Sequence, residues 1–333
     1  NAFSTPYLAK DYRDGKGRRA IRSYMDNGYI PLEDMVEEAF HTNEQTSRTL
    51  EYAYDDYAVA QMAKALHDSC QDATLRQKYL EDYNDLMRRS ENWRNVINPA
   101  TGWADGRYEN GKWENNEDLV HRKSYITEGA TCHYTWYVPQ NPEGLFEVIR
   151  NSKPMDKLEK QIEKAERKME KKGETPVRNE KVIARLDKMF DNGWYWHGNE
   201  PCHQIAYLYD AAGAPEKTQE RVHHILQTEY NDTPGGLSGN DDAGQMSAWY
   251  VFSSIGFYPV CPGTPYYYIG TPSFDKVTLN LENGRKFILS ADGVSKDAFY
   301  IQKMSLNDKP FWGYKLSHKD ILNGGKLKFQ MKK

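Results

Sequence analysis

The segment from Trp194 to Gln204 concentrates side chains that could do chemistry. It reads Trp-Tyr-Trp-His-Gly-Asn-Glu-Pro-Cys-His-Gln. Pro201 suits the first position of a helix, so Asn199 and Glu200 are expected in the loop that enters that helix. Glutamate is not a favoured N-cap residue, and the simplest structural role for Glu200 is an interaction with the helix dipole. The segment therefore offers an amide, a carboxylate and His197 as candidates for binding or catalysis.

A second polar segment, residues 238–249, reads Ser-Gly-Asn-Asp-Asp-Ala-Gly-Gln-Met-Ser-Ala-Trp. Asp241 or Asp242 could simply cap the apolar helix that follows. One cap needs a single side chain, however, and Asn240 adds an amide. Oxygen groups of this kind bind hard cations such as calcium, and a carboxylate could also activate water as a general base. The twelve-residue EF-hand pattern is absent, so a calcium site would be assembled from separate segments.

Two further segments carry ionisable groups. Residues 125–136 place Glu128 before a glycine and His133 five residues later. A histidine of this kind, taken alone, is more often part of a core than of a site. Asp55 and Asp56 are adjacent within a helical stretch, where the polar face of that helix is the simpler explanation.

Carboxylates near helix starts, interleaved with Trp and Tyr, suit glycoside hydrolysis. An inverting glycosidase uses an acid and a base roughly 6.5–9.5 Å apart, with room for water between them. The chain has 24 Tyr and 8 Trp among 333 residues, and both side chains complement surfaces that are apolar on one side and hydrogen-bonding on the other. Trp103 lies in a long, turn-rich loop over 95–116, and loops of that length are usually functional or disordered.

Charge and hydropathy exclude other classes of function. The formal net charge is −4, which gives no electrostatic case for binding nucleic acid. No apolar run approaches the roughly 20 residues of a membrane-spanning helix. The four cysteines are widely spaced and form no CxxC pair, so neither a zinc site nor a dense disulfide framework is indicated.

Periodicity predicts a helical body followed by a small β region. Residues 1–30 are polar and indicate loop, whereas apolar residues at helical spacing predict helices at 31–66, 72–90, 142–152, 180–191, 201–213, 215–230 and 243–256. The Lys- and Glu-rich stretch 153–180 predicts a solvated surface helix. Alternation predicts strands at 277–281, 286–290 and 326–330, with a hairpin turn at Asn283-Gly284. We therefore expect domains over 1–258 and 259–333.

Six stretches of the chain resemble glycoside hydrolase family 92, the calcium-dependent inverting exo-α-mannosidases. They occur in the family's order and cover most of the chain; the two most specific contain GNEP and GNDDAGQMSAWYVF. The six stretches are residues 49–66, 98–107, 127–145, 197–219, 230–263 and 267–281.

The resemblance implies an (α/α)6 toroid whose loops form the pocket, incomplete here at its N-terminus. It also implies that the β region over 259–333 packs on the toroid or on an N-terminal β-sandwich. Family members carry this β-sandwich, which this chain lacks and would need for a complete site. Mannose-containing glycans are the implied substrates. The chain begins at Asn1 without a signal peptide; a periplasmic, cell-surface or secreted location follows from the resemblance alone.

The resemblance also assigns roles to the four polar segments. Asp242, together with Asp241, is similar to the general base that activates water. Calcium is implied near the mannose 2- and 3-hydroxyls, held by Asn199, Glu200, Asn240 and Asp242. The expected substrate contacts are His197, His133, Asn199, Asp55, Asp56 and Trp103.

The general acid is where this chain departs from the family pattern. The family motif reads like EGNxWQY or EGNxWEY, whereas this chain has EGATCHY, with Cys132 and His133 in place of Trp and Gln or Glu. Glu128 and Glu200 remain candidates for the acid; if the acid belongs at the position of His133, the chain uses this histidine or has altered leaving-group chemistry. Members that lack the acid carboxylate act on mannose-1-phosphodiesters, whose leaving group needs no protonation, so this reaction is an alternative. Gly198 argues against α-1,2 specificity.

Two other classes of protein are alternatives. A degenerate toroid would bind mannosides without cleaving them. A polysaccharide lyase would need cationic groups to neutralise uronates, and the acidic loop over 240–242 has the wrong charge for that.

Overall fold

The computed structural model describes residues 17–35 and 42–333. The chain forms two compact units, Asn1–Ala165 and Glu166–Lys333, each described by itself below. The predicted domain boundary after residue 258 falls inside the second unit, close to where helices give way to strands after Ile255, and it remains a prediction. Within the described ranges, no helix is both long enough and apolar enough to cross a membrane.

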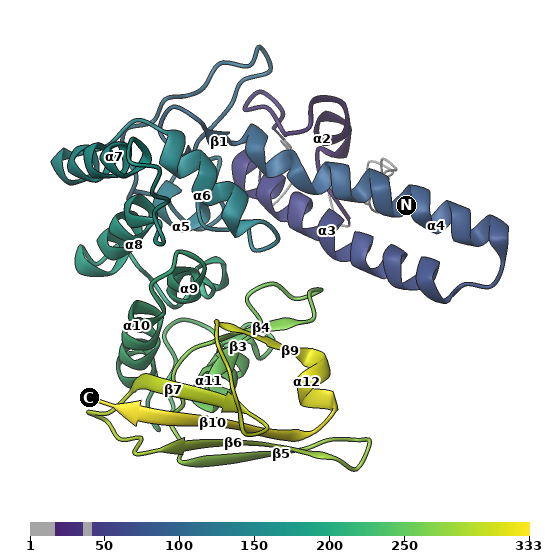
Figure 1. The fold of residues 1–333 in the computed structure, drawn as a ribbon. Coiled ribbons are helices and arrows are strands. Elements are labelled where there is room, and N and C mark those ends of the chain that lie inside the picture. Colours follow the sequence, from purple (N-terminus) through teal and green to yellow (C-terminus); the bar gives the residue numbers. More distant parts are fainter. Residues whose placement is uncertain (1–16, 36–41) are drawn as a thin grey trace. The chain divides into compact units, whose positions relative to one another are not determined.

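The first unit is built around a hairpin of two long helices, α3 (Gln45–Ser69) and α4 (Ala73–Arg89), which run side by side (Figure 1). Asp72 caps α4 by accepting a hydrogen bond from the Leu75 amide at 2.9 Å. The remaining elements are α2 (Ile21–Asn27), the 3₁₀ helix η1 (Ser90–Asn95), β1 (Ile97–Asn98), β2 (Trp103–Ala104), α5 (Thr131–Tyr134), α6 (Pro142–Asn151) and most of α7 (Lys157–Glu170).

Two predictions for this unit are corrected. A helix beginning at Pro31 is wrong for residues 31–35 and 42–44, since Glu44 adopts a left-handed backbone with φ of 74° and α3 begins after it. Residues 36–41 of that predicted helix lie outside the described part. The expectation of loop up to residue 30 is wrong where α2 forms, and residues 1–16 are again outside the described part.

The second unit contains α8 (Glu180–Asp191) and α10 (Pro215–Thr228), as predicted. The continuous helix predicted over 201–213 is wrong, because the segment divides into η2 (Glu200–Cys202), η3 (Ile205–Tyr207) and α9 (Leu208–Ala211). Two carbonyls that a regular helix would use accept side-chain hydrogen bonds instead. Trp249 Nε1 donates to the His203 carbonyl at 3.0 Å, and Gln204 Nε2 donates to the Pro201 carbonyl at 2.7 Å.

The C-terminal part of this unit holds a five-stranded sheet (Figure 1). In spatial order its strands are β5 (Lys276–Asn280), β6 (Lys286–Asp292), β10 (Gly325–Lys332), β7 (Tyr300–Leu306) and β8 (Lys309–Pro310). The predicted hairpin is confirmed, since β5 and β6 pair antiparallel across a turn in which Gly284 has a φ of 79°. β10 lies between β6 and β7 and runs parallel to β6.

One face of this sheet is apolar and the other is polar. Phe287, Leu289, Leu327 and Phe329 are almost fully buried, whereas the alternate residues of β10 are exposed. The buried face belongs to a core that also includes residues of α11 (Gln245–Ile255), α12 (His318–Leu322) and the small sheet of β3 (Phe257–Tyr258), β4 (Tyr266–Ile269) and β9 (Lys315–Ser317). The chain is thus mainly helical with a smaller C-terminal β region, as predicted.

Candidate active site

The two acidic segments of the second unit meet at a pair of glycines. A β-carbon on Gly239 would lie 2.6 Å from the Gly198 carbonyl oxygen, and one on Gly198 would lie 2.9 Å from the Ser238 carbonyl oxygen. Gly239 also has a φ of +80°, which other residues rarely adopt. The close approach therefore requires glycine on both sides, and it brings the loop 197–200 against the loop 238–242.

His197 anchors the first loop within an aromatic cluster. Its Nδ1 is 2.7 Å from the Tyr195 hydroxyl and its Nε2 is 2.6 Å from the Tyr230 hydroxyl. The ring stacks on His203 and meets Trp249 edge-on, with centroid distances of 4.8 and 4.4 Å. Only 1% of the residue is exposed. Both ring nitrogens have protein partners, so a contact between His197 and substrate, as predicted, would require the ring to break these hydrogen bonds. In the structure the ring holds the loop in place.

Burial also fixes the charge of this histidine. Desolvation, reinforced by His203, lowers the pKa of His197 to about 2, so the ring is neutral throughout the physiological range. The folded protein then binds fewer protons than the unfolded chain between pH 6.5 and about 2.

Stability of the second unit should accordingly fall as the pH drops below 6.5. Each pH unit of that fall removes about 1.4 kcal/mol for a group whose folded pKa lies far below the solution pH. Replacing His197 with Gln should flatten the dependence of the unfolding free energy on pH between 6.5 and 4.5, as measured by urea denaturation. The exposed His224 provides the control, and equal slopes for His197→Gln and His224→Gln would contradict the prediction.

His203, which the sequence analysis did not single out, connects the first loop to α11. Its Nε2 donates to the His197 carbonyl at 3.1 Å, so its Nδ1 accepts from Gln245 Nε2, also at 3.1 Å. Gln245 donates in addition to the Tyr258 hydroxyl at 2.9 Å. Burial lowers the pKa of His203 to about 4, which preserves this neutral arrangement. The only feature of the sequence that pointed to His203 was its position three residues after Glu200.

The two adjacent aspartates have different surroundings. Asp241 Oδ1 accepts hydrogen bonds from the Ser247 amide and hydroxyl, each at 2.9 Å, and the Asp241 carbonyl accepts from the Met246 amide at 3.2 Å. Asp241 is therefore occupied in forming the start of α11. Asp242 is exposed and has a left-handed backbone with φ of 42°. Non-glycine residues in that region are uncommon and cluster at functional sites, so Asp242 is the better candidate for chemistry.

The predicted metal ligands have the donor chemistry that calcium prefers. Asn199 and Glu200 are half-buried beside the glycine contact, and Asn240 and Asp242 are exposed across it. All four offer oxygen, the donor atom of calcium rather than zinc sites. Over the described ranges, no group of three or more His, Cys, Asp or Glu side chains is already arranged to hold a metal ion. Any calcium site here would thus rely on amide or main-chain oxygens as well as carboxylates, and this donor set supplies them.

Glu128 lies in the first unit, on a loop fastened to the N-terminus of α3. The Thr46 amide donates to the Tyr125 carbonyl at 3.0 Å, and the Thr127 amide donates to Ser47 Oγ at 2.9 Å. Glu128 itself is exposed, with a left-handed backbone at φ of 51°. The loop therefore presents a carboxylate to solvent in a conformation that few glutamates adopt.

His133 has a structural contact beside this loop. Its Nδ1 accepts a hydrogen bond from the Ala130 amide at 3.2 Å, at the start of α5. Nδ1 is therefore the acceptor nitrogen, which leaves Nε2 as the proton-bearing one in the neutral ring. The side chain is half-buried, and its predicted contact with substrate remains a prediction.

A carboxyl group that the sequence analysis missed is Glu51 on α3. Its Oε1 accepts from the Tyr134 hydroxyl at 3.2 Å. Burial, reinforced by the negative charges of Asp55 and Glu44, raises the pKa of Glu51 to about 7. A carboxylic acid that keeps its proton near neutrality is suited to general acid catalysis. The sequence feature that could have identified Glu51 is a stripe of charged residues at helical spacing, at positions 44, 48, 51 and 55.

Of the remaining predicted sugar contacts, Asp56 and Trp103 are buried in the first unit, whereas Asp55 is exposed. Asp56 is fully buried and accepts from Arg18 at 2.7 Å and from the Tyr24 hydroxyl at 2.9 Å. Asp55 is exposed and lies 3.3 Å from Arg18. Trp103 is only 3% exposed. These contacts favour a structural function for Asp56 and Trp103, while Asp55 remains accessible.

Comparisons with known proteins point to one family. The model of the glycosyl hydrolase family 92 catalytic domain matches residues 2–333. A protein of Arthroderma benhamiae described as an uncharacterized secreted glycosidase is 28% identical over 345 residues, which is 96% of this chain and 40% of that protein.

Solved structures agree with this match. A family GH92 α-mannosidase from Bacteroides thetaiotaomicron has a TM-score of 0.76 at 35% identity, covering 94% of this chain and 37% of that one. A GH92 inverting mannosidase from the same organism has a TM-score of 0.77 at 31% identity, covering 98% and 44%. These matches confirm the predicted fold class, a helical toroid domain followed by a smaller β region. The chain spans about two-fifths of the length of these relatives.

Proposed function

Since the chain belongs to glycosyl hydrolase family 92, we propose that it hydrolyses terminal α-mannosidic linkages of glycans, with inversion and with the help of calcium. The observation that carries the proposal is the contact between the loops 197–200 and 238–242 at Gly198 and Gly239, together with the exposed Asp242 in the second loop. Support for mannosides comes from the two matched bacterial structures, which are described as mannosidases. One of them is also described in complex with mannoimidazole.

Asp242 is the proposed general base. Its carboxylate takes a proton from a water molecule whose oxygen attacks the anomeric carbon on the face opposite the leaving group. The bond from that carbon to the glycosidic oxygen breaks as the new bond forms, and the departing oxygen receives a proton from the acid. Asp241 holds the start of α11 through Ser247, and thereby fixes the backbone from which Asp242 projects.

Calcium would be held by Asn199, Glu200, Asn240 and Asp242. When bound, it would orient the vicinal hydroxyls of mannose and stabilise negative charge on them. The chain's own contribution is to fix the two loops, through the paired glycines and the neutral ring of His197.

We propose Glu128 as the general acid, because it is exposed and its loop is fastened to the start of α3 through Tyr125 and Thr127. Glu51 and Glu200 are the other carboxyl candidates. An alkoxide is a poor leaving group and needs this proton, whereas a nitrophenolate or a phosphodiester does not. Hydrolysis of mannose-1-phosphodiesters is the second candidate function, and Cys132-His133 in the motif favours it.

Replacing Glu128 with Gln should therefore separate two substrates. We expect kcat on α-mannobioses to fall by about 10²-fold or more, and kcat on a dinitrophenyl α-mannoside to fall much less. Steady-state kinetics of the Gln variants at 128, 51 and 200 and of His133→Gln identify the acid as the one variant with that split. If none shows it and mannose-1-phosphodiesters are cleaved faster than mannobioses, the phosphodiester reaction is the function.

The proposal as a whole is tested by incubating the complete protein with mannobioses of each linkage. Mannose should be released in the presence of calcium, and proton NMR should detect β-mannose first, as inversion requires. Binding of mannosides without release would instead favour a non-catalytic relative. We also propose a periplasmic, cell-surface or secreted location, supported by the fungal relative's description as secreted; fractionation of the source cells tests it.

A further inference from the structure

A hollow of about 630 Å³ lies against β7 and β10 in the C-terminal part of the second unit. This volume is within the range of small-molecule sites, about 300–1,000 Å³. None of its lining residues belongs to the loops 197–200 and 238–242. The hollow is therefore a separate feature that the proposed hydrolytic reaction does not use.

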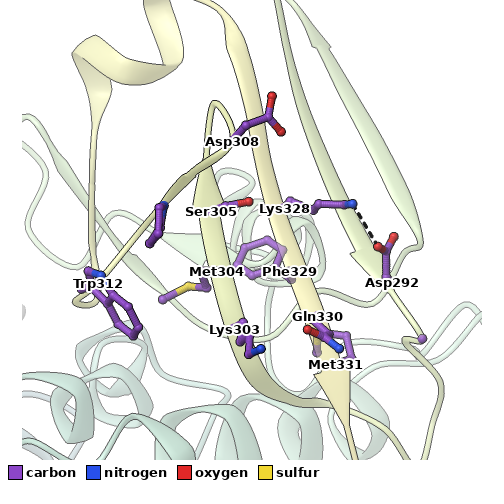
Figure 2. A pocket seen from close by; sticks show the side chains of 12 residues that line it. Asp292, Lys303, Met304, Ser305, Asp308, Trp312, Lys328, Phe329, Gln330 and Met331 are labelled. Carbon is purple, nitrogen blue, oxygen red and sulfur yellow. Dashed lines mark ion pairs between the residues drawn. The ribbon is translucent and has the colours of Figure 1, made fainter.

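Trp312 forms one side of this hollow. It follows β8 in a loop that turns at Gly313, and 85% of the residue is exposed. Figure 2 shows the indole on one side, Lys328 and Asp292 on the other, and the Met304 side chain pointing toward the indole. The indole therefore offers the hollow an apolar face with a hydrogen-bonding N–H at its edge.

The polar groups of the hollow select a neutral ligand. Lys328 and Asp292 form an ion pair at 3.3 Å, and Lys303 and Asp308 add one charge of each sign. With two cations and two anions, the lining offers no excess charge to a phosphate or a polyanion. Ser305 and Gln330 add uncharged donors and acceptors. An aromatic face flanked by hydrogen-bonding groups of both kinds matches the alternating apolar and hydroxyl surfaces of a sugar chain.

We propose that this hollow binds a stretch of neutral α-mannan, with a sugar ring stacked on Trp312, as an accessory site apart from the hydrolytic one. The choice of mannan rests on the proposed function, whereas the neutral sugar chemistry rests on the hollow alone. The site would hold a long substrate near the enzyme and leave small substrates unaffected.

The test uses the complete protein and soluble α-mannan as the probe, with two measurements. The first is the retardation of the protein in native gels that contain mannan, measured with Asp242→Asn as the parent protein so that the polymer stays intact. The second is hydrolysis of nitrophenyl α-mannoside, measured with Asp242 unchanged. Trp312→Ala should weaken retardation about tenfold and leave nitrophenyl mannoside hydrolysis within twofold. Trp312→Phe should retain most of the retardation. Phe274 is half-exposed and does not line the hollow, so Phe274→Ala should change neither measurement.

Each result decides a different claim. Equal retardation of the Trp312→Ala and Phe274→Ala proteins overturns the accessory site, as does the absence of any retardation. The inference also fails if Trp312→Ala lowers nitrophenyl mannoside hydrolysis as much as it lowers retardation, because the change then reaches the whole fold. If no mannoside is hydrolysed but retardation still depends on Trp312, the proposed function fails and the accessory site stands.

Discussion

Replacing Asp242 with Asn is expected to lower kcat by roughly 10²–10⁴-fold, the usual contribution of a general base. The change keeps the size of the side chain and removes only the group that accepts a proton from water. Asp242 is exposed, and the hydrogen bonds at the start of α11 involve the Asp241 side chain. The fold of the second unit should therefore survive, and KM for an aryl α-mannoside should change much less than kcat.

A matched control is available nearby. Asp232 is also exposed, in the turn that precedes the acidic loop, and Asp232→Asn should leave kcat within a factor of about two. Asp241→Asn should mainly lower the melting temperature, since it weakens the bonds to Ser247. Near-normal turnover of the Asp242→Asn protein, with circular dichroism unchanged, would remove the general base role.

Local sequence patterns predicted much of the fold, because these helices and hairpins are determined by residues that are close together in the sequence. Alternation around Asn283-Gly284 identified the β5–β6 hairpin, and helical spacing located α4, α8 and α10. The parallel pairing of β10 with β6 was beyond such patterns, since it joins strands more than thirty residues apart. The break in the helix expected over 201–213 involves the indole of Trp249, which comes from a distant helix.

The difference between local patterns and contacts from distant segments also applies to the candidate site. Residue types and glycine-rich spacing selected the loops that contain Glu200 and Asp242, and the structure brings these loops together. The burial of His197 could not be predicted, because Tyr230 and Trp249 reach it from other segments. Glu51 was missed for a related reason, since its raised pKa results from burial that the helix pattern alone does not reveal.

Removing calcium is the second change with a large expected effect. Exhaustive chelation should lower kcat/KM by roughly 10²-fold or more, since a Lewis acid at a sugar hydroxyl supplies several kcal/mol. Calcium should restore activity and zinc should not, because Asn199, Glu200, Asn240 and Asp242 offer only oxygen. The melting temperature should also rise with calcium concentration, since an ion that binds only the folded state stabilises it by mass action.

A ligand variant distinguishes metal binding from proton donation. Glu200→Gln should need a higher calcium concentration for half-maximal activity and should lose aryl mannoside and mannobiose hydrolysis in parallel, whereas loss of an acid affects mannobioses selectively. Glu220 is half-exposed on α10, away in sequence from both loops, so Glu220→Gln should behave as wild type. Full activity after chelation, with a melting temperature that does not respond to calcium, would contradict the metal site. The exposed Asp242 would then act on water without an ion beside it, and the amides of Asn199 and Asn240 would be left to bind the sugar hydroxyls directly.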